Sequence, residues 1–323
     1  MSRSLATRAD RISILRPKRM VTQPNGESTL QPNHRLARTS RATRSLPKSG
    51  NGSISKTCPE TCRRSFPLNA VDENFVCHLE SNARRFAGRT ALVWEGGSLT
   101  WSELDGLASG FARYLSGNGV RAGDRVAIVV PNRPDFVIAF LGVLKLGATP
   151  APLNPLLKSE ELAAFTEDLR PRLVVDRVKA APGVWDTVDH TAAPALILYT
   201  SGSTGRPKGA VFSHSALTFA NRSWGEPVMG LTPDDRVLAA LPLAHSLGLN
   251  GALLAPLLFG ATVALVERFT PEAVFDAIQR DRVTVFPGVA TVFRRLLNSP
   301  AFSDADFSSL RHAVSGAAPC PWE

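Results

Sequence analysis

A glycine-rich segment between two apolar runs constrains the fold of this chain more than any other feature. Residues 196–199 (LILY) are followed at once by residues 200–209 (TSGSTGRPKG) and then by residues 210–212 (AVF). Glycines let a backbone turn tightly and approach an anion, while hydroxyls and exposed N–H groups donate hydrogen bonds to it. Lys208 adds a compact positive charge. The pattern predicts a strand, a phosphate-binding loop and a second strand, with a nucleoside triphosphate as the expected ligand.

The spacing within this loop differs from that of the common P-loop. Lys208 follows Pro207 and precedes Gly209, whereas the P-loop places Gly-Lys-Ser/Thr at the start of a helix. Residues 199–209 resemble, position for position, the Tyr-Thr-Ser-Gly-(Ser/Thr)-Thr-Gly-x-Pro-Lys-Gly loop of the adenylate-forming (AMP-dependent synthetase and ligase) superfamily. The alternative is a Ser/Gly-rich surface hairpin that binds nothing. The resemblance implies these nucleotide-binding residues: Thr200, Ser201, Gly202, Ser203, Thr204, Gly205 and Lys208.

Further segments between Phe66 and Glu323 resemble the same superfamily. Residues 99–104 (LTWSEL) are similar to its first core motif, and Thr100 and Glu103 have the spacing of a helix capping box. Residues 241–249 (LPLAHSLGL) are similar to the motif that lines the acyl pocket, where the resemblance gives His245 a place near the reacting carboxylate. Taken alone, a histidine among leucines is more often a satisfied core residue. Residues 315–319 (SGAAP) are similar to the segment beside the adenine ring, which implies nucleotide contacts from Gly316, Ala317 and Ala318.

The resemblance is strongest to acyl-CoA synthetases (fatty-acid CoA ligases), and it implies a reaction in two steps. A carboxylic acid and ATP, with Mg²⁺, give acyl-AMP and pyrophosphate, and CoA then displaces AMP. Lys208 and His245 are the implied catalytic residues. Residues 241–250 contain no Asp or Glu to pair with a substrate ammonium, which favours a fatty or aryl acid over an amino acid. The alternatives are an inactive nucleotide-binding fragment or pseudoenzyme and the adenylation domain of another acyl-activating system.

The chain lacks motifs that complete members of the superfamily carry after the adenine segment. These are a Tyr-Gly-x-Thr-Glu motif, a ribose-binding aspartate, a hinge and a small C-terminal domain with a catalytic lysine. The tyrosines are Tyr114 and Tyr199, and neither precedes a glycine. We therefore expect residues 67–323 to be the N-terminal half of such a ligase, truncated and without full activity.

The basic charge of the chain is concentrated in residues 1–66. They hold 14 of the 37 Lys and Arg and 3 of the 28 Asp and Glu, which leaves 23 and 25 in the other 257 residues. Their polar, aromatic-poor composition predicts a disordered tail. A transit peptide, a basic arm for nucleic acid or anionic lipid, and a mis-assigned start codon are the candidate explanations, and we favour the last. The chain is accordingly predicted to be cytoplasmic, or organellar if the tail is a transit peptide, with no nucleic-acid partner and no transmembrane segment.

The pattern after Phe66 predicts an α/β fold with stacked mixed or parallel sheets covered by helices. Short β-branched runs such as residues 126–130 alternate with helical stretches such as residues 134–146. Later units repeat the arrangement, with a strand at 261–266, a helix from Thr270 to Ile278, and a strand at 283–286.

Cysteines and potential metal ligands are sparse. Cys58 and Cys62 have no second pair or histidines at zinc spacing, and Cys77 and Cys320 stand alone. The pattern predicts free thiols and no structural metal site.

Overall fold

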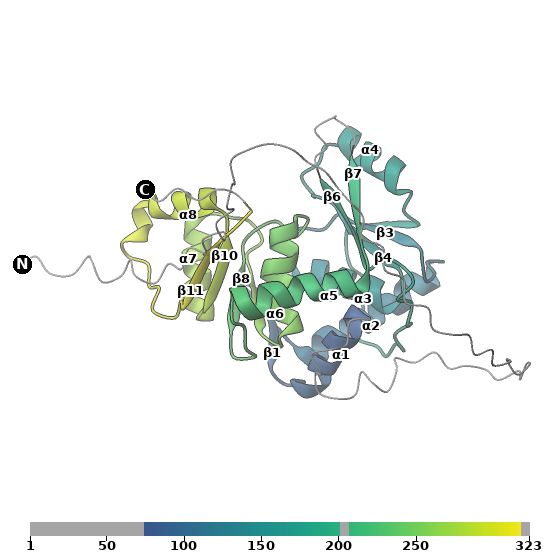
Figure 1. Cartoon of the computed structure of the whole chain (residues 1–323), viewed down its shortest axis with the longest axis horizontal. Coiled ribbons are helices and arrows are strands. Elements are labelled where there is room, and N and C mark those ends of the chain that lie inside the picture. The colour runs from purple at the N-terminus through teal and green to yellow at the C-terminus, as the bar shows by residue number, and fades with distance from the viewer. Residues whose placement is uncertain (1–73, 201–206, 318–323) are drawn as a thin grey trace, which may run out of the picture. The chain divides into compact units, whose positions relative to one another are not determined.

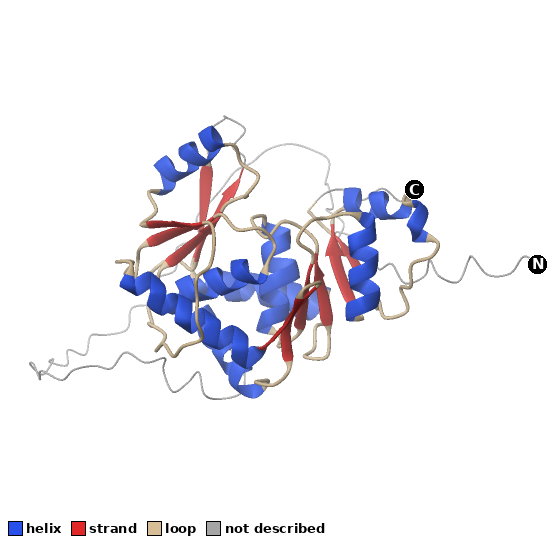
Figure 2. Ribbon diagram, turned by 180° about the vertical axis from the view of Figure 1, so that it is seen from behind, coloured by secondary structure: helices blue, strands red, loops and turns tan. Residues whose placement is uncertain are grey.

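The computed structural model describes residues 74–200 and 207–317, so the tail and its boundary near residue 66 lie outside it. The described residues form an α/β fold, as the sequence predicts (Figures 1 and 2). In chain order the elements are α1 (Phe75–Arg85), β1 (Thr90–Trp94), β2 (Gly97–Thr100), α2 (Trp101–Gly117), β3 (Arg125–Ile128), α3 (Pro134–Lys145), β4 (Thr149–Pro152), α4 (Ser159–Leu169), β5 (Leu173–Val175), β6 (Leu196–Thr200), β7 (Lys208–Phe212), α5 (His214–Ser223), the π-helical η3 (Trp224–Val228), β8 (Arg236–Ala239), the π-helical η4 (Leu247–Leu254), α6 (Ala255–Leu258), β9 (Thr262–Leu265), α7 (Pro271–Asp281), β10 (Val285–Gly288), α8 (Ala290–Leu297), the 3₁₀ turn η5 (Pro300–Phe302) and β11 (His312–Ser315).

The largest sheet has six strands in the order β11-β10-β8-β9-β1-β2. All neighbouring pairs are parallel except β1 and β2, which form an antiparallel hairpin. Parallel neighbours need crossover connections, and helices provide them: α7 joins β9 to β10, for example. The strands from β11 to β1 therefore end at the same edge of the sheet.

Helices cover both faces of this sheet, which explains why its central strands β8, β9 and β10 are mostly buried and apolar. Side chains alternate between faces, so Leu238 of β8 packs in a cluster with α7 and α8, while Val237 and Ala239 belong to clusters on the other face. That second face contacts η4 and α6 and continues into the packing of α1, α2 and α3. Figure 2 shows helices on either side of these strands.

The other described strands form two smaller sheets. β3 lies between β4 and β5 in a parallel three-stranded sheet, and β6 and β7 pair as an antiparallel hairpin. Leu169 of α4 packs with Ala127, Leu153 and Ile197 in one apolar cluster. Helix α4 thus joins the hairpin to the three-stranded sheet.

Local sequence signals place the helix starts more accurately than the strand ends. Thr100 and Glu103 form the expected capping box, with the Glu103 N–H 3.2 Å from Thr100 Oγ1 and the Thr100 N–H 2.8 Å from Glu103 Oε2. Thr270 caps α7 as expected, although the helix continues past Ile278 to Asp281. The strand expected at 283–286 instead spans 285–288, because strand limits depend on pairing with β8 and β11.

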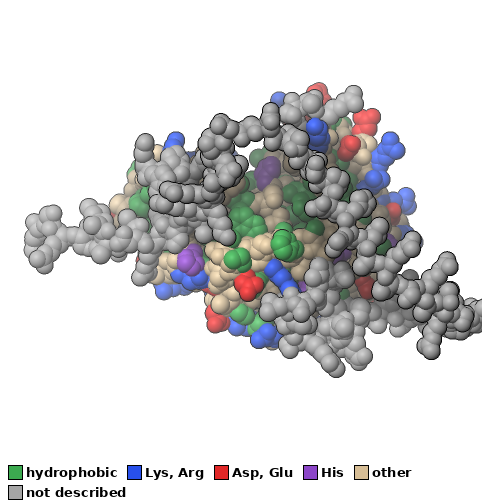
Figure 3. Space-filling model, in the orientation of Figure 1, with side chains coloured by type: hydrophobic (Ala, Val, Ile, Leu, Met, Phe, Trp, Pro, Cys, Tyr) green, Lys and Arg blue, Asp and Glu red, His purple; other side chains and the backbone are tan. Residues whose placement is uncertain are grey.

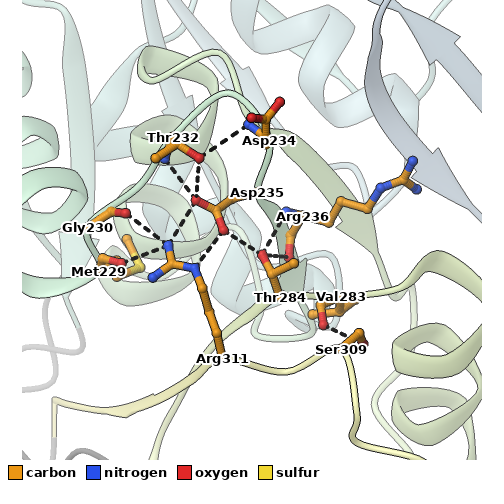
Figure 4. A network of polar contacts seen from close by, with 10 residues as sticks. All are labelled: Met229, Gly230, Thr232, Asp234, Asp235, Arg236, Val283, Thr284, Ser309 and Arg311. Carbon is orange, nitrogen blue, oxygen red and sulfur yellow. Dashed lines mark hydrogen bonds and ion pairs between the residues drawn. The ribbon is translucent and has the colours of Figure 1, made fainter.

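A saturated polar network closes the amino end of the large sheet (Figure 4). Asp235, just before β8, accepts hydrogen bonds from Arg311 Nε and Nη2, both at 2.8 Å, and from Thr284 Oγ1 at 2.7 Å. Its other donors are the Thr232 N–H at 2.8 Å and Oγ1 at 3.0 Å. Burial alone raises the pKa of this carboxyl, but the donors outweigh it and hold the pKa below its ordinary value. Three strand starts are thereby tied together.

Two further observations concern the cysteines and membranes. Cys77 in α1 is buried and disulfide-bonded, which corrects the expectation that all four cysteines are free thiols. Within residues 74–200 and 207–317, no helix is both long and apolar enough to cross a membrane.

Candidate functional site

The β6–β7 hairpin brings the two ends of the glycine-rich segment together. Thr200, the last residue of β6, is paired directly with Lys208, the first residue of β7, and both are exposed. The strands expected on either side of the segment are confirmed. Ser201, Gly202, Ser203, Thr204 and Gly205 lie outside the described residues. Thr200 and Lys208 are therefore the two neighbouring positions between which the rest of the glycine-rich segment is connected.

Helix α4 holds this hairpin close to the glycine-rich segment. The Tyr199 hydroxyl donates a 2.5 Å hydrogen bond to Asp168 Oδ2, and the Tyr199 ring meets Phe165 edge-to-face at 5.1 Å. Burial first, and then the Asp168 carboxylate, raises the pKa of the Tyr199 phenol, so the phenol remains a donor at neutral pH. Across the hairpin, a Cβ atom on Gly209 would lie 3.3 Å from Tyr199 Cζ. The glycine at this position leaves room for the ring.

The segment that carries His245 follows β8 and is clamped by a buried amide from another sheet. Asn132, after β3, donates from Nδ2 to the Leu241 carbonyl at 2.8 Å and accepts at Oδ1 from the Leu243 N–H at 3.0 Å. The side chain of His245 is exposed, so the core alternative for this histidine is wrong. Its carbonyl accepts a 2.8 Å hydrogen bond from the Leu249 N–H at the start of η4. The imidazole is thus held out of the core on a fixed backbone.

The π-helical segment η4 packs tightly against the same loop. A Cβ atom on Gly248 would lie 2.3 Å from the Pro242 carbonyl oxygen, so only glycine permits this approach. π-Helical turns are rare and occur frequently at functional sites. Nothing in the local sequence periodicity signals a π-helix here.

The segment predicted to lie beside the adenine follows β11 at the carboxyl edge of the sheet. The Gly316 N–H donates to the Gly288 carbonyl at 3.1 Å, and Ala317 is exposed with a φ of 62°. The Ser315 hydroxyl is buried and has no hydrogen-bond partner among the described residues. Ala318 lies beyond the described residues.

The carboxyl edge of the large sheet therefore collects the His245 segment and the Gly316 segment. They follow β8 and β11, which flank β10. The carboxyl edge is where open α/β sheets bind ligands. On the face seen in Figure 3, hydrophobic side chains gather in the middle, beside a histidine. Lys208 belongs to the separate hairpin.

Sequence reasoning missed two residues that build this edge. Asn132 is one, and its only signal is an amide a few residues after a buried strand. The other is Trp224 at the start of η3: a Cβ atom on Gly316 would lie 3.3 Å from its Cη2, and one on Gly251 would lie 3.8 Å from its Cε3. No group of three or more His, Cys, Asp and Glu side chains able to hold a metal occurs in the part of the chain that the structure describes.

Comparison with known protein families identifies the chain. The model of the AMP-binding enzyme family matches residues 79–192 and 184–323. The chain belongs to this family. The curated relatives it matches are acyl-CoA and aryl-CoA ligases, and the chain spans about half of their length.

A ligase of Mycobacterium tuberculosis is one such relative. This 3-[(3aS,4S,7aS)-7a-methyl-1,5-dioxo-octahydro-1H-inden-4-yl]propanoyl:CoA ligase is 34% identical over 287 residues, and the match covers 75% of this chain and 56% of the relative. The anthranilate CoA ligase AuaEII, solved in complex with anthranoyl-AMP, superposes with a TM-score of 0.70 and 27% identity over 78% of this chain and 55% of that one. The N-terminal domain of FACL13 from M. tuberculosis gives a TM-score of 0.68 and 26% identity over 77% and 71% of the two chains. These matches confirm the predicted fold and superfamily.

Proposed function

We propose that this chain binds ATP and a carboxylic acid and joins them as acyl-AMP, the first half-reaction of an acid:CoA ligase. The observation that carries the proposal is the pairing of Thr200 with Lys208 at the end of the β6–β7 hairpin where the glycine-rich segment joins the two strands. This pairing presents a lysine beside a segment of glycines and hydroxyls, which is the chemistry that holds phosphate groups. Family membership supports the choice of an adenine nucleotide.

In the proposed reaction, a carboxylate oxygen of the acid attacks the α-phosphorus of ATP. The new oxygen–phosphorus bond gives acyl-AMP, and the bond to the β-phosphate breaks to release pyrophosphate. Thr200, Ser201, Ser203, Thr204 and Lys208 would donate to the phosphates, with Gly202 and Gly205 allowing the backbone to approach. Gly316, Ala317 and Ala318 would lie against the adenine. In a second half-reaction, the CoA thiolate attacks the acyl carbon and AMP leaves.

His245 is the proposed contact for the substrate carboxylate. Its side chain is exposed at the carboxyl edge, and its backbone is fixed by η4 and, through Leu243, by Asn132. An imidazole so placed donates a hydrogen bond to an anion. Residues 241–250 carry no acidic side chain, which supports a fatty or aryl acid without an α-amino group.

Mg²⁺ accompanies the nucleotide in this proposal. Because the described residues hold no cluster of three metal-binding side chains, they do not form a protein cage for a cation. The triphosphate itself supplies oxygens of the kind that Mg²⁺ prefers. We assign the ion no protein ligand and no step.

Calorimetric titration of ATP followed by acid-dependent ATP–pyrophosphate exchange tests the proposal. We expect ATP to bind and exchange to depend on fatty or aryl acids but not on free amino acids. Lys208→Ala is expected to reduce exchange about 30-fold to 1000-fold, because one preorganised charge contributes about 2–4 kcal/mol. Lys179→Ala, at another exposed lysine, is the matched control and should change exchange less than threefold.

The alternatives give different results in the same experiment. ATP binding without exchange for any acid would favour the pseudoenzyme. Exchange that responds best to amino acids would favour another acyl-activating system. A chain that binds no ATP would overturn the proposed function.

A further inference from the structure

The rings of Phe293 and Trp224 pack against glycine residues at the carboxyl edge of the large sheet. A Cβ atom on Gly288, the last residue of β10, would lie 2.9 Å from Cε2 and Cζ of Phe293. A Cβ atom on Gly316 would lie 3.3 Å from Trp224, and one on Gly251 would lie 3.8 Å from it, in ordinary van der Waals contact. A larger side chain at Gly288 or Gly316 would therefore press on a ring, whereas the Gly251 backbone packs beside the indole.

Trp224 is the residue that joins the two predicted substrate segments. Its Cη2 approaches Gly316 after β11, while its Cε3 approaches Gly251 within η4, the helix that follows His245. The indole is only partly buried although it contacts both apolar clusters that flank β8 and β10. A partly buried indole thus packs between the two segments where the acid and the nucleotide are proposed to bind.

The backbone that carries Trp224 is closely packed. It begins η3, and a Cβ atom on the next residue, Gly225, would lie 2.2 Å from Cε2 of Phe259, so this backbone is pressed against a partly buried ring. Beside Gly316, the buried Ser315 Oγ has no hydrogen-bond partner among the described residues. A buried hydroxyl without a partner leaves hydrogen-bonding capacity at this corner.

We propose that Trp224 is the specificity-determining contact for the acid and that it selects a planar aryl acid over a long alkyl chain. The inference rests on the proposed function. A flat ring fixed between two glycines offers an extended apolar surface, and aromatic rings prefer offset or edge-on stacking at such a surface. A flexible alkyl chain gains less from the same contact and loses more conformational freedom when it is ordered there.

The affinities of non-hydrolysable acyl-sulfamoyl adenosines test this. Calorimetry on the full 323-residue chain would compare the benzoyl and hexadecanoyl analogues, with AMP as the nucleotide reference. The wild-type chain should bind the benzoyl analogue at least tenfold more tightly than the hexadecanoyl analogue. Trp224→Ala should reduce that ratio at least tenfold and change the affinity for AMP less than threefold.

Companion variants separate recognition from folding. Trp224→Phe keeps a planar ring and should keep the benzoyl preference within threefold. Trp224→Leu keeps apolar volume without a ring and should lose the preference, while circular dichroism and the melting temperature verify its fold. Trp94→Ala removes a half-buried indole from β1, away from β11 in the strand order, and should leave the ratio unchanged.

The outcomes distinguish the two proposals. If the analogues bind but every Trp224 variant keeps the wild-type ratio within threefold, the assignment of Trp224 is overturned and the proposed function stands. If the wild-type chain prefers the hexadecanoyl analogue, the aryl preference is overturned. If the wild-type chain binds neither ATP nor any analogue, the proposed function fails, and the role of Trp224 fails with it.

Discussion

The two ends of the six-stranded sheet differ in how their polar groups are used. At the amino end, the Asp235 carboxylate accepts hydrogen bonds from Arg311, Thr284 and Thr232, and Arg311 also donates to the Met229 and Gly230 carbonyls. At the carboxyl end, Ser315 Oγ has no partner among the described residues, and His245 exposes its side chain. A saturated network stabilises the strands it joins, whereas unpaired groups lower stability and keep hydrogen-bonding capacity for a ligand.

The amino end of the sheet therefore contributes mainly to stability, whereas the carboxyl end carries the groups that are proposed to bind a ligand. Both ends are built by the same parallel strands β8, β10 and β11. Because the ends lie at opposite edges, a substitution in the amino-end network should change folding without changing ligand preference. The following predictions test that separation, from the largest expected effect to the smallest.

Removing the central carboxylate of the amino-end network should have the largest effect of any single substitution. Asp235→Ala leaves the Arg311 guanidinium and the Thr284 hydroxyl without their main acceptor, which should lower the free energy of unfolding by about 3–5 kcal/mol. Urea denaturation measures this. Asp234→Ala is the control, because its ion pair with Arg89 is exposed and should contribute about 1 kcal/mol or less. Equal effects of the two variants would contradict a special role for the network.

Acid should destabilise the chain through a third region, the contact between α1 and α5. Burial, and secondarily Arg222, lowers the pKa of His78 to about 4, and burial also lowers the pKa of His214 to about 4. His214 Nδ1 accepts the Phe75 N–H at 3.2 Å, which requires a neutral ring. The unfolded chain binds protons below its ordinary histidine pKa, so stability is fully present above pH 6.5 and is lost as the pH falls toward 4.

Each of these histidines should account for about 3 kcal/mol of the loss between those limits. Chemical denaturation at stepped pH measures the slope. His78→Gln should reduce the slope, whereas His245→Gln, at an exposed histidine, should leave it unchanged. The amino-end network should not contribute in this range, because the pKa of Asp235 is held below its ordinary value of 3.8. A pH-independent stability between 6.5 and 4.5 would contradict the assignment.

Removing the Asn132 hydrogen bonds to the His245 segment should lower the free energy of unfolding and make the backbone of this segment more mobile. Asn132→Ala removes the acceptor for the Leu243 N–H and the donor to the Leu241 carbonyl, at a cost of about 1–3 kcal/mol in unfolding free energy. Amide hydrogen exchange should rise at Leu243 and its neighbours. Asn298→Ala, at an exposed asparagine, is the control. Unchanged exchange at Leu243 in the Asn132 variant would show that the clamp is dispensable.

A helix cap outside the Asp235 network gives the baseline for a local contact. Thr100→Ala removes the side-chain acceptor for the Glu103 N–H and should cost about 1 kcal/mol. Thermal unfolding measures it, with Thr100→Ser as the variant that keeps the hydroxyl and should stay within about 0.5 kcal/mol of wild type. A loss as large as that of Asp235→Ala would remove the distinction between local caps and the network.

The sequence predicted those parts of the site whose interacting residues lie close together in the chain. The β6–β7 hairpin could be predicted because its strands adjoin the glycine-rich segment, and turn chemistry and apolar runs act over a few residues. The strand at 285–288 was displaced from its predicted limits because pairing with β8 and β11, rather than local β propensity, sets its ends. The functional roles of Lys208, His245 and Gly316 stay predictions.

By itself, the sequence determined the superfamily, the α/β class, the capping box at Thr100 and the two strands on either side of the glycine-rich segment. Each of these depends on local spacing or on a contiguous motif. Only the tertiary structure placed Asn132 on a carbonyl 109 residues away, joined Arg311 to Asp235 across 76 residues, and set Trp224 between Gly251 and Gly316. Such contacts form when sheets and helices pack, and no periodicity or turn signal encodes them, because burial and hydrogen-bond satisfaction are decided by the whole fold.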